Sequence, residues 1–188
     1  MCEGAKTEPN YFKSIQSELP RKTIEIKILG EGRNTLSLVK SAIEARDRQA
    51  ETGSYEFDKV WVVFDRDSFP PDSFDNAIRS ATAHLIDCAW SNEAFEFWYI
   101  LHFEYRNTGM SRTEYQGKLT ELLGEPYQKN DPQMYQKLSR REGSWLRAAE
   151  RARRLYIDFT ASKTPPSQSN PCTTVYKLIE ELDQFRAK

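Results

Sequence analysis

Hydrophobic and polar residues follow two different periods along the first hundred positions. Apolar residues at helical spacing predict helices over residues 11–19, 34–43, 72–83 and 92–103. Stretches of alternating or continuous apolar residues, rich in β-branched and aromatic types, predict strands over residues 23–29, 55–64 and 84–90. This alternation of helices and strands predicts an α/β fold with a mostly parallel sheet flanked by helices.

The pattern becomes helical after residue 103. Apolar spacing there predicts helices over residues 113–124, 132–141, 144–160 and 173–187, with a loop rich in Thr, Pro, Ser and Asn over residues 163–171. We therefore expect an α/β core over residues 1–103 and a helical extension over residues 104–188. The two parts should pack together as one compact domain.

Composition limits the kinds of site the chain can hold. Hydrophobic residues make up 38% and aromatic residues 12% of the 188 residues, which is enough for a buried core. The net charge is −1, so a nucleic acid would have to bind a local basic face. Three cysteines without a CxxC pair and two histidines argue against a disulfide framework and a zinc site. Without a membrane-length apolar stretch or a signal peptide, we expect a cytoplasmic protein that does not bind membranes.

Two aspartates follow the most apolar of the predicted strands, in the sequence VWVVFDRDSF. Asp65 and Asp67 are two positions apart, which in an extended chain spans roughly 6.6 Å and places both side chains on one side. Like charges at the end of a buried strand repel each other unless a cation neutralises them. Carboxylate oxygens are ligands that Mg²⁺ prefers. A solvated turn is the alternative, but the buried strand favours a Mg²⁺ or Mn²⁺ site.

A third carboxylate is found near the N-terminus, in CEGAKTEPNYF. Glu3 and Gly4 precede a predicted helix, and glycine there permits a tight strand-to-helix turn. A Glu-Gly turn followed by a strand that ends in Asp-x-Asp resembles the Toprim fold of topoisomerases, primases and some nucleases.

Four motifs extend this resemblance to one family. CEGAKTEPNYF, VWVVFDRDSF, AWSNEAFEFWYILHF and NPCTTVYKLIEEL occur in an order and spacing similar to those of the RloB-like family, from Cys2 to about Leu182. That family comprises Toprim-type proteins of prokaryotic defence and restriction-modification loci, often encoded beside an ATPase. The family also has a hydrophobic strand just before the Cys-Glu-Gly turn, so we expect the first sheet strand to be missing from this chain.

The resemblance implies a role for several residues. Glu3 would act as general acid or base, with Asp65 and Asp67 as magnesium ligands at the catalytic centre. Glu96, together with Glu3, would complete the metal shell. Lys6 and His102 also match motif positions, and we expect them to contact the substrate.

A second set of basic residues lies on the predicted helix over residues 144–160. Arg147, Arg151 and Arg154 follow i, i+4 and i+7 spacing and so share one helical face. That face could bind phosphates. The alternative is a solvated face that pairs with Glu150 and Asp158.

These features favour a magnesium-dependent nuclease that hydrolyses phosphodiester bonds of DNA or RNA. The resemblance places it in prokaryotic antiviral or restriction-linked defence, acting with an ATPase partner. Two alternatives remain open. One is a non-catalytic, Toprim-like subunit that binds a defence ATPase, and the other is a different Toprim phosphoryl- or nucleotidyl-transfer activity.

Overall fold

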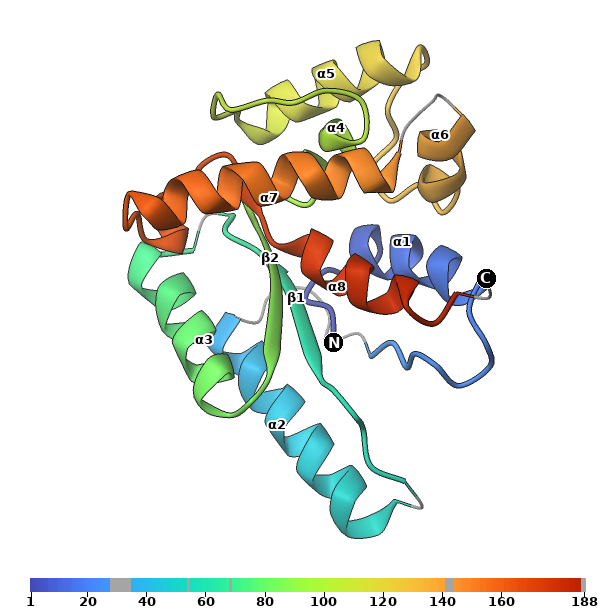
Figure 1. Cartoon of the computed structure of the whole chain (residues 1–188), viewed down its shortest axis with the longest axis vertical. Coiled ribbons are helices and arrows are strands. Elements are labelled where there is room, and N and C mark those ends of the chain that lie inside the picture. Colours follow the sequence, from blue (N-terminus) through green and yellow to red (C-terminus); the bar gives the residue numbers. More distant parts are fainter. Residues whose placement is uncertain (28–34, 54, 68, 141–143, 187–188) are drawn as a thin grey trace.

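A small sheet lies between layers of helices in the computed structural model, which describes residues 1–27, 35–53, 55–67, 69–140 and 144–186 (Figure 1). Within these ranges the α-helices are α1 (Thr7–Gln16), α2 (Thr35–Thr52), α3 (Pro71–Ala83), α4 (Glu96–Leu101), α5 (Arg112–Leu123), α6 (Met134–Arg140), α7 (Trp145–Ala161) and α8 (Val175–Asp183). The strands are β1 (Trp61–Asp65), β2 (Asp87–Asn92) and β3 (Cys172–Thr173), and a 3-10 turn, η1, covers Pro166–Gln168. The chain is therefore a mixed α/β protein, as its pattern predicted.

The sheet has the order β1-β2-β3, with β1 and β2 parallel and β3 antiparallel to β2. Helix α3 connects the two parallel strands. Asp65 pairs with Ser91 at the carboxyl end of both strands. Strand β3 lies in the region predicted as loop and helix, so the part after residue 104 adds a strand to the sheet as well as helices.

The first three residues of the chain run beside β1. The Val63 N–H donates to the Met1 carbonyl (2.8 Å), the Glu3 N–H donates to the Val63 carbonyl (2.9 Å), and Cys2 pairs with Val63 in parallel orientation. On the other side, the Cys2 N–H donates to the Lys27 carbonyl (2.9 Å). This segment therefore occupies a position in line with the sheet, next to β1.

The strand predicted over residues 23–29 does not form in its described part. Residues 24–27 have no regular secondary structure, and residues 28 and 29 lie outside the described ranges. Ile24 and Ile26 still pack against the core although they are only partly buried. Their alternation with charged residues therefore reflects one buried side of an irregular segment, and not a strand in the sheet.

Strand β1 separates two hydrophobic clusters because its side chains alternate between the faces of the sheet. Val62 and Phe64 pack against residues of α2 and α3. Val63 packs in the larger cluster, which includes residues of α1 and of α4 to α8. In Figure 1, α2 and α3 lie on one side of the strands and α1 and α8 on the other. A sheet covered on both faces explains the almost continuous apolar run in β1.

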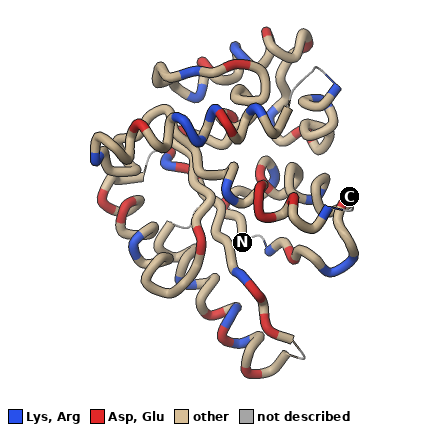
Figure 2. Tube along the Cα trace, viewed as in Figure 1, with Lys and Arg blue, Asp and Glu red and all other residues tan. Residues whose placement is uncertain are grey.

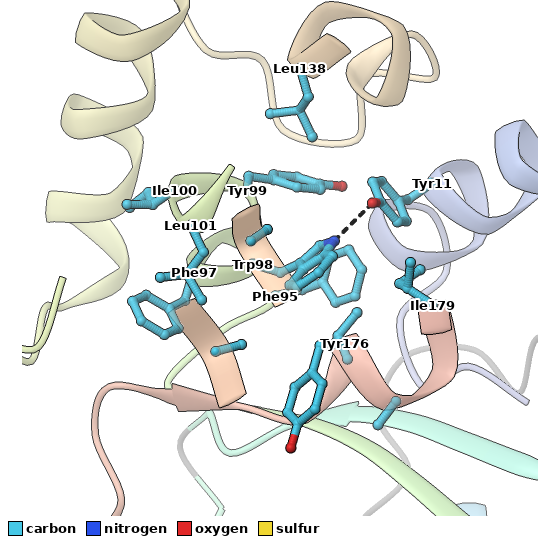
Figure 3. Close-up of a cluster of buried hydrophobic side chains, with 14 of the residues drawn as sticks. Tyr11, Phe95, Phe97, Trp98, Tyr99, Ile100, Leu101, Leu138, Tyr176 and Ile179 are labelled. Carbon is cyan, nitrogen blue, oxygen red and sulfur yellow. Dashed lines mark hydrogen bonds between the residues drawn. The ribbon is translucent and has the colours of Figure 1, made fainter. Parts of the chain in front are cut away.

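Helix α4 lies within the larger cluster, and all six of its residues are buried. Around it the ring of Phe95 meets the rings of Tyr11 (71°) and Tyr99 (88°) nearly edge to face, and the Trp98 ring meets that of His102 in the same way (81°) (Figure 3). The Trp98 indole N–H donates to the Tyr11 hydroxyl (2.8 Å), which lies 3.5 Å from Nε2 of His102. Nδ1 of His102 lies 2.9 Å from the Trp98 carbonyl. These polar groups thus satisfy one another inside an apolar core.

The described helices are all too short or too polar to traverse a lipid bilayer.

Burial of His102 predicts a pH-dependent loss of stability. Desolvation lowers the pKa of His102 from 6.5 to about 4, so the folded protein keeps the ring neutral while the unfolded chain binds a proton. Stability is therefore lost as the pH falls through the unfolded value, by roughly 2 kcal/mol between about pH 7 and about pH 5. Urea unfolding at both pH values should show this loss in wild type, relative to His102→Gln. The exposed His84, changed to Gln, is the control and should keep the wild-type dependence. The same change in the free energy of unfolding between the two pH values in wild type and His102→Gln would contradict the prediction.

Candidate active site at the carboxyl ends of the strands

Glu3 and Asp65 lie next to each other because their two segments run parallel. The backbone N–H of Asp65 lies near the Glu3 carboxylate and acts to lower the pKa of Glu3. The Asp65 side chain is 16% exposed, and its Oδ1 is buried without a hydrogen-bond partner among the described residues. The carboxyl ends of parallel strands are where functional groups collect in such sheets. The structure thus brings together the two acids that the sequence placed at this edge.

Asp67 lies near Asp65, but through a backbone turn and not through the extended chain that the sequence predicted. Strand β1 ends at Asp65, and Asp67 has a left-handed backbone (φ 43°), which aspartate tolerates better than most residues. Its N–H donates to the Glu93 carbonyl (3.1 Å), which fixes the turn. The two aspartates are therefore not presented by one extended chain, and the strand-spacing argument was wrong in its geometry. Even so, both carboxylates face one nitrogen, Nη2 of Arg112, at 3.8 Å from Asp65 and 3.1 Å from Asp67.

Glu8 is a further acid at this site that the sequence interpretation missed. It lies in the first turn of α1 and is only 5% exposed. Its carboxylate rests against Gly4, where an added Cβ would come within 2.1 Å of Oε2. A side chain at position 4 would therefore displace the Glu8 carboxylate from its present place. A glutamate one helical turn after a Glu-Gly pair, in the first turn of a helix, was the available signal.

Glu96 is buried (8% exposed) at the start of α4. The Tyr127 hydroxyl donates to its Oε1 (3.1 Å), which orients the carboxylate. The negative charge of Glu96 acts on both Asp65 and Glu8. Glu96 therefore belongs to the same group of acids, although it comes from a different element.

These five residues, Glu3, Glu8, Asp65, Asp67 and Glu96, form what we call the acidic cluster. Burial, followed by the charge of Glu8, raises the pKa of Glu3 to about 7. Burial and the charge of Glu96 raise the pKa of Glu8 to about 7 as well. Burial and the charges of Glu8 and Glu96 raise the pKa of Asp65 well above its usual value. Desolvation and like charge are the two effects that make a carboxylate a strong site for a proton or a cation.

The acidic cluster has the chemistry of a site for a hard divalent ion. It offers carboxylate oxygens, which Mg²⁺ and Mn²⁺ prefer, and Oδ1 of Asp65 makes no hydrogen bond within the described part of the chain. Among the described residues, however, no three His, Cys, Asp or Glu side chains are placed to hold one ion together. The donor set therefore fits such an ion, but the side chains do not form a finished cage in this conformation.

The other residues expected to bind substrate lie outside the acidic cluster. Lys6 precedes α1 with an exposed side chain, while His102 is in the core, only 3% exposed, with its ring nitrogens facing Tyr11 and Trp98. The structure gives His102 a scaffold role, and the contacts of both residues with substrate stay predictions.

The arginines of α7 have partners within the chain. Nη1 of Arg151 donates to the Leu101 carbonyl at the end of α4 (2.7 Å), and the Arg154 guanidinium lies over the ring of Tyr105, 4.6 Å from its centre. Arg147 is exposed. In Figure 2, acidic and basic residues are interspersed over the helices. Arg151 thus contributes to holding α4 in place, and phosphate binding by this helix stays a prediction.

The fold and the acidic cluster define an α/β protein with carboxylates gathered at the carboxyl ends of parallel segments. The chain belongs to the RloB-like protein family, whose sequence model matches residues 1–182, nearly the whole chain. No curated protein and no solved structure matches the chain.

Replacing Glu8 should stabilise the protein in the absence of metal. A carboxyl with a folded pKa of about 7 binds a proton that the unfolded chain releases near pH 4.5, so its cost to stability grows as the pH rises between these values. Glu8→Gln keeps the shape and removes the charge. In chelator, we expect urea unfolding to show a gain of roughly 1–3 kcal/mol at about pH 8, which shrinks towards about pH 4. The exposed Glu51, changed to Gln, should give no gain. A loss of stability at about pH 8 would contradict the charge argument.

Proposed function

We propose that this chain is a Toprim-type nuclease that uses a divalent metal ion to hydrolyse phosphodiester bonds in DNA or RNA. The observation that carries the proposal is that Glu3, Asp65 and Asp67 lie together at the carboxyl ends of parallel segments, where one Asp65 oxygen has no hydrogen-bond partner among the described residues. A purely structural role would not require five acidic side chains to lie close enough to repel one another. Such a group is stabilised when a cation enters it.

Each acid has a role that its surroundings support. Asp65, Asp67 and Glu96 would hold Mg²⁺ or Mn²⁺, which when bound supplies positive charge to the phosphate oxygens. Glu3, with a pKa of about 7, can give or take a proton near neutral pH. It would protonate the leaving oxygen or accept a proton from the attacking water. Glu8 and Tyr127 would set the charge and the orientation of these groups.

We extend the proposal to the biological setting that the family implies. The protein would act in prokaryotic antiviral or restriction-linked defence, together with an ATPase partner. Support for this part comes from membership of the RloB-like family, which covers nearly the whole chain. Lys6 and the arginine face of α7 are the expected contacts to the nucleic acid.

A second candidate function is a non-catalytic subunit that retains the acidic cluster and binds a defence ATPase. One observation favours it: Arg112 already lies against Asp65 and Asp67, so an internal charge partly neutralises the site. A different Toprim phosphoryl- or nucleotidyl-transfer reaction would use the same acids. The product formed from a nucleic-acid substrate distinguishes these activities.

The nuclease proposal predicts linked effects of metal on stability and cleavage. With Mg²⁺ or Mn²⁺ at a hundred times its dissociation constant, binding should add about 2.7 kcal/mol to the stability of the wild type. Asp65→Asn keeps the shape but removes a charge, so we expect it to lose most of this gain and all cleavage of labelled DNA and RNA. Glu51→Gln is the control and should match the wild type in both assays. Metal binding without cleavage, with or without an ATPase partner, would favour the non-catalytic subunit. An equal metal effect in wild type and Asp65→Asn would place the ion elsewhere.

The arginine face predicts a change in salt dependence. Changing Arg147 and Arg154 to Gln should weaken nucleic-acid binding and reduce the slope of log affinity against log salt by about one unit per lost phosphate contact. Arg151 is left intact because its guanidinium holds the end of α4. Filter binding over a series of salt concentrations measures the slope, and cleavage at saturating substrate should survive. An unchanged affinity and slope would assign this face to the scaffold.

A further inference from the structure

A basic residue that forms ion pairs with the acidic cluster comes from a segment that the sequence interpretation did not connect with the site. Arg112 is the first residue of α5, and a capping box fixes the backbone there: the Ser111 hydroxyl accepts from the Glu114 N–H (3.4 Å), and the Glu114 carboxylate accepts from the Ser111 N–H (2.7 Å). From this anchored position the side chain reaches Asp65 and Asp67. The capping box contributes about 1 kcal/mol to stability and fixes the position of the Arg112 backbone.

The charge of Arg112 acts on most of the acidic cluster. Its guanidinium opposes the raised pKa of Glu3, of Glu8 and of Asp65. Lys129 contributes to Glu8 as well, from an exposed position. Arginine remains protonated at any working pH, so this charge leaves the acids only if the side chain moves.

The ion pairs of Arg112 with Asp65 and Asp67 are weak enough to be broken when another cation binds the two carboxylates. Both ion pairs run from Nη2, at 3.1 Å and 3.8 Å, and the guanidinium makes no two-pronged hydrogen-bonded pair with either carboxylate in the described part of the chain. Its Nε is buried and has no hydrogen-bond partner among the residues that the structure describes, although the side chain as a whole is 39% exposed. A single-nitrogen ion pair at a partly open site is weak, and the side chain has solvent to move into.

We propose that Arg112 is an internal counter-ion of the acidic cluster, and that a divalent metal ion binds by displacing it from Asp65 and Asp67. The inference rests on the proposed function in that the displacing ion is the Mg²⁺ or Mn²⁺ of that site. Arg112 faces the two carboxylates that the ion would need, which accounts for the unfinished cage in the metal-free conformation. Two cations cannot share these oxygens without repelling each other.

Metal binding to an Arg112 variant tests this displacement. Titration calorimetry with Mn²⁺, and thermal melts with Mn²⁺ or Mg²⁺, would compare wild type with Arg112→Gln and Arg112→Lys. We expect Arg112→Gln to melt lower than wild type in chelator, because its acids lack a counter-ion, and to bind Mn²⁺ about tenfold more tightly. Arg112→Lys keeps the charge and should bind close to wild type.

Arg106 provides a matched control. Like Arg112 it is partly exposed (32%) and forms an ion pair through a guanidinium nitrogen, here Nη1 with Glu104 at 3.5 Å. Its Nε is also buried, with no partner in the described ranges. Arg106→Gln should leave Mn²⁺ affinity unchanged. A second measurement uses the wild type itself: the Nε–H signal of Arg112, assigned by its loss in Arg112→Lys, should shift on addition of Mg²⁺, while that of Arg106 should not. This measurement holds even if Arg112→Gln fails to fold.

The outcomes separate this inference from the proposed function. Equal or weaker Mn²⁺ affinity in Arg112→Gln, or an Arg112 signal that Mg²⁺ leaves in place, would overturn the counter-ion role even if the protein cleaves nucleic acid. If Arg112→Gln binds Mn²⁺ more tightly but the wild type cleaves no nucleic acid, the counter-ion role is supported and the nuclease proposal is wrong. If neither wild type nor the variant binds metal, both the displacement and the metal-dependent nuclease are wrong.

Discussion

The parallel alignment of the first three residues with β1 is the constraint on which the site depends. Two backbone hydrogen bonds to Val63 fix the register, so that Glu3 follows the paired segment beside the end of β1. Because side chains in paired segments follow the register, no rotation of Glu3 alone could replace this alignment. The same register leads the chain past Gly4 into α1, which places Glu8 over the glycine. One short pairing thus positions two acids near Asp65.

Bringing buried acids together costs stability, and the helices hold them in place. Glu96 is fixed because all residues of α4 are buried in the larger hydrophobic cluster. Glu8 is fixed because the aromatic residues of α1 pack in that hydrophobic cluster too. The chain of hydrogen bonds from Trp98 to Tyr11 and on to His102 ties these two helices together. Polar groups that satisfy one another in a core specify one arrangement of the elements around them. The aromatic core therefore contributes to the site by holding α1 and α4, which carry Glu8 and Glu96, in place.

The positions of most helices, of strands β1 and β2 and of Asp65 at the end of β1 could be predicted from the sequence, since they depend on local patterns. Helix α3 begins at Pro71 and ends near Ala83, as its proline and apolar spacing indicate. The left-handed turn at Asp67, the short β3 and the arrival of Arg112 could not be predicted, because each depends on contacts between distant segments. Glu8 lies between these cases. Its spacing from Gly4 is visible in the sequence, but only the fold shows that its carboxylate is buried.

The C-terminal motif NPCTTVYKLIEEL shows that a family motif can serve the scaffold of a site. Strand β3 has only two residues, and threonine side chains extend its pairing with β2. The Thr174 hydroxyl accepts from the Trp90 N–H (3.0 Å) and donates to the Cys88 carbonyl (3.0 Å), while that of Thr173 lies 2.9 Å from Ser91 Oγ. These bonds satisfy backbone groups of β2 up to the position that faces Asp65. The motif therefore supports the acidic cluster from the other edge of the sheet, where β3 pairs with β2. A displacement of β2 would move both Asp65 and the start of α4.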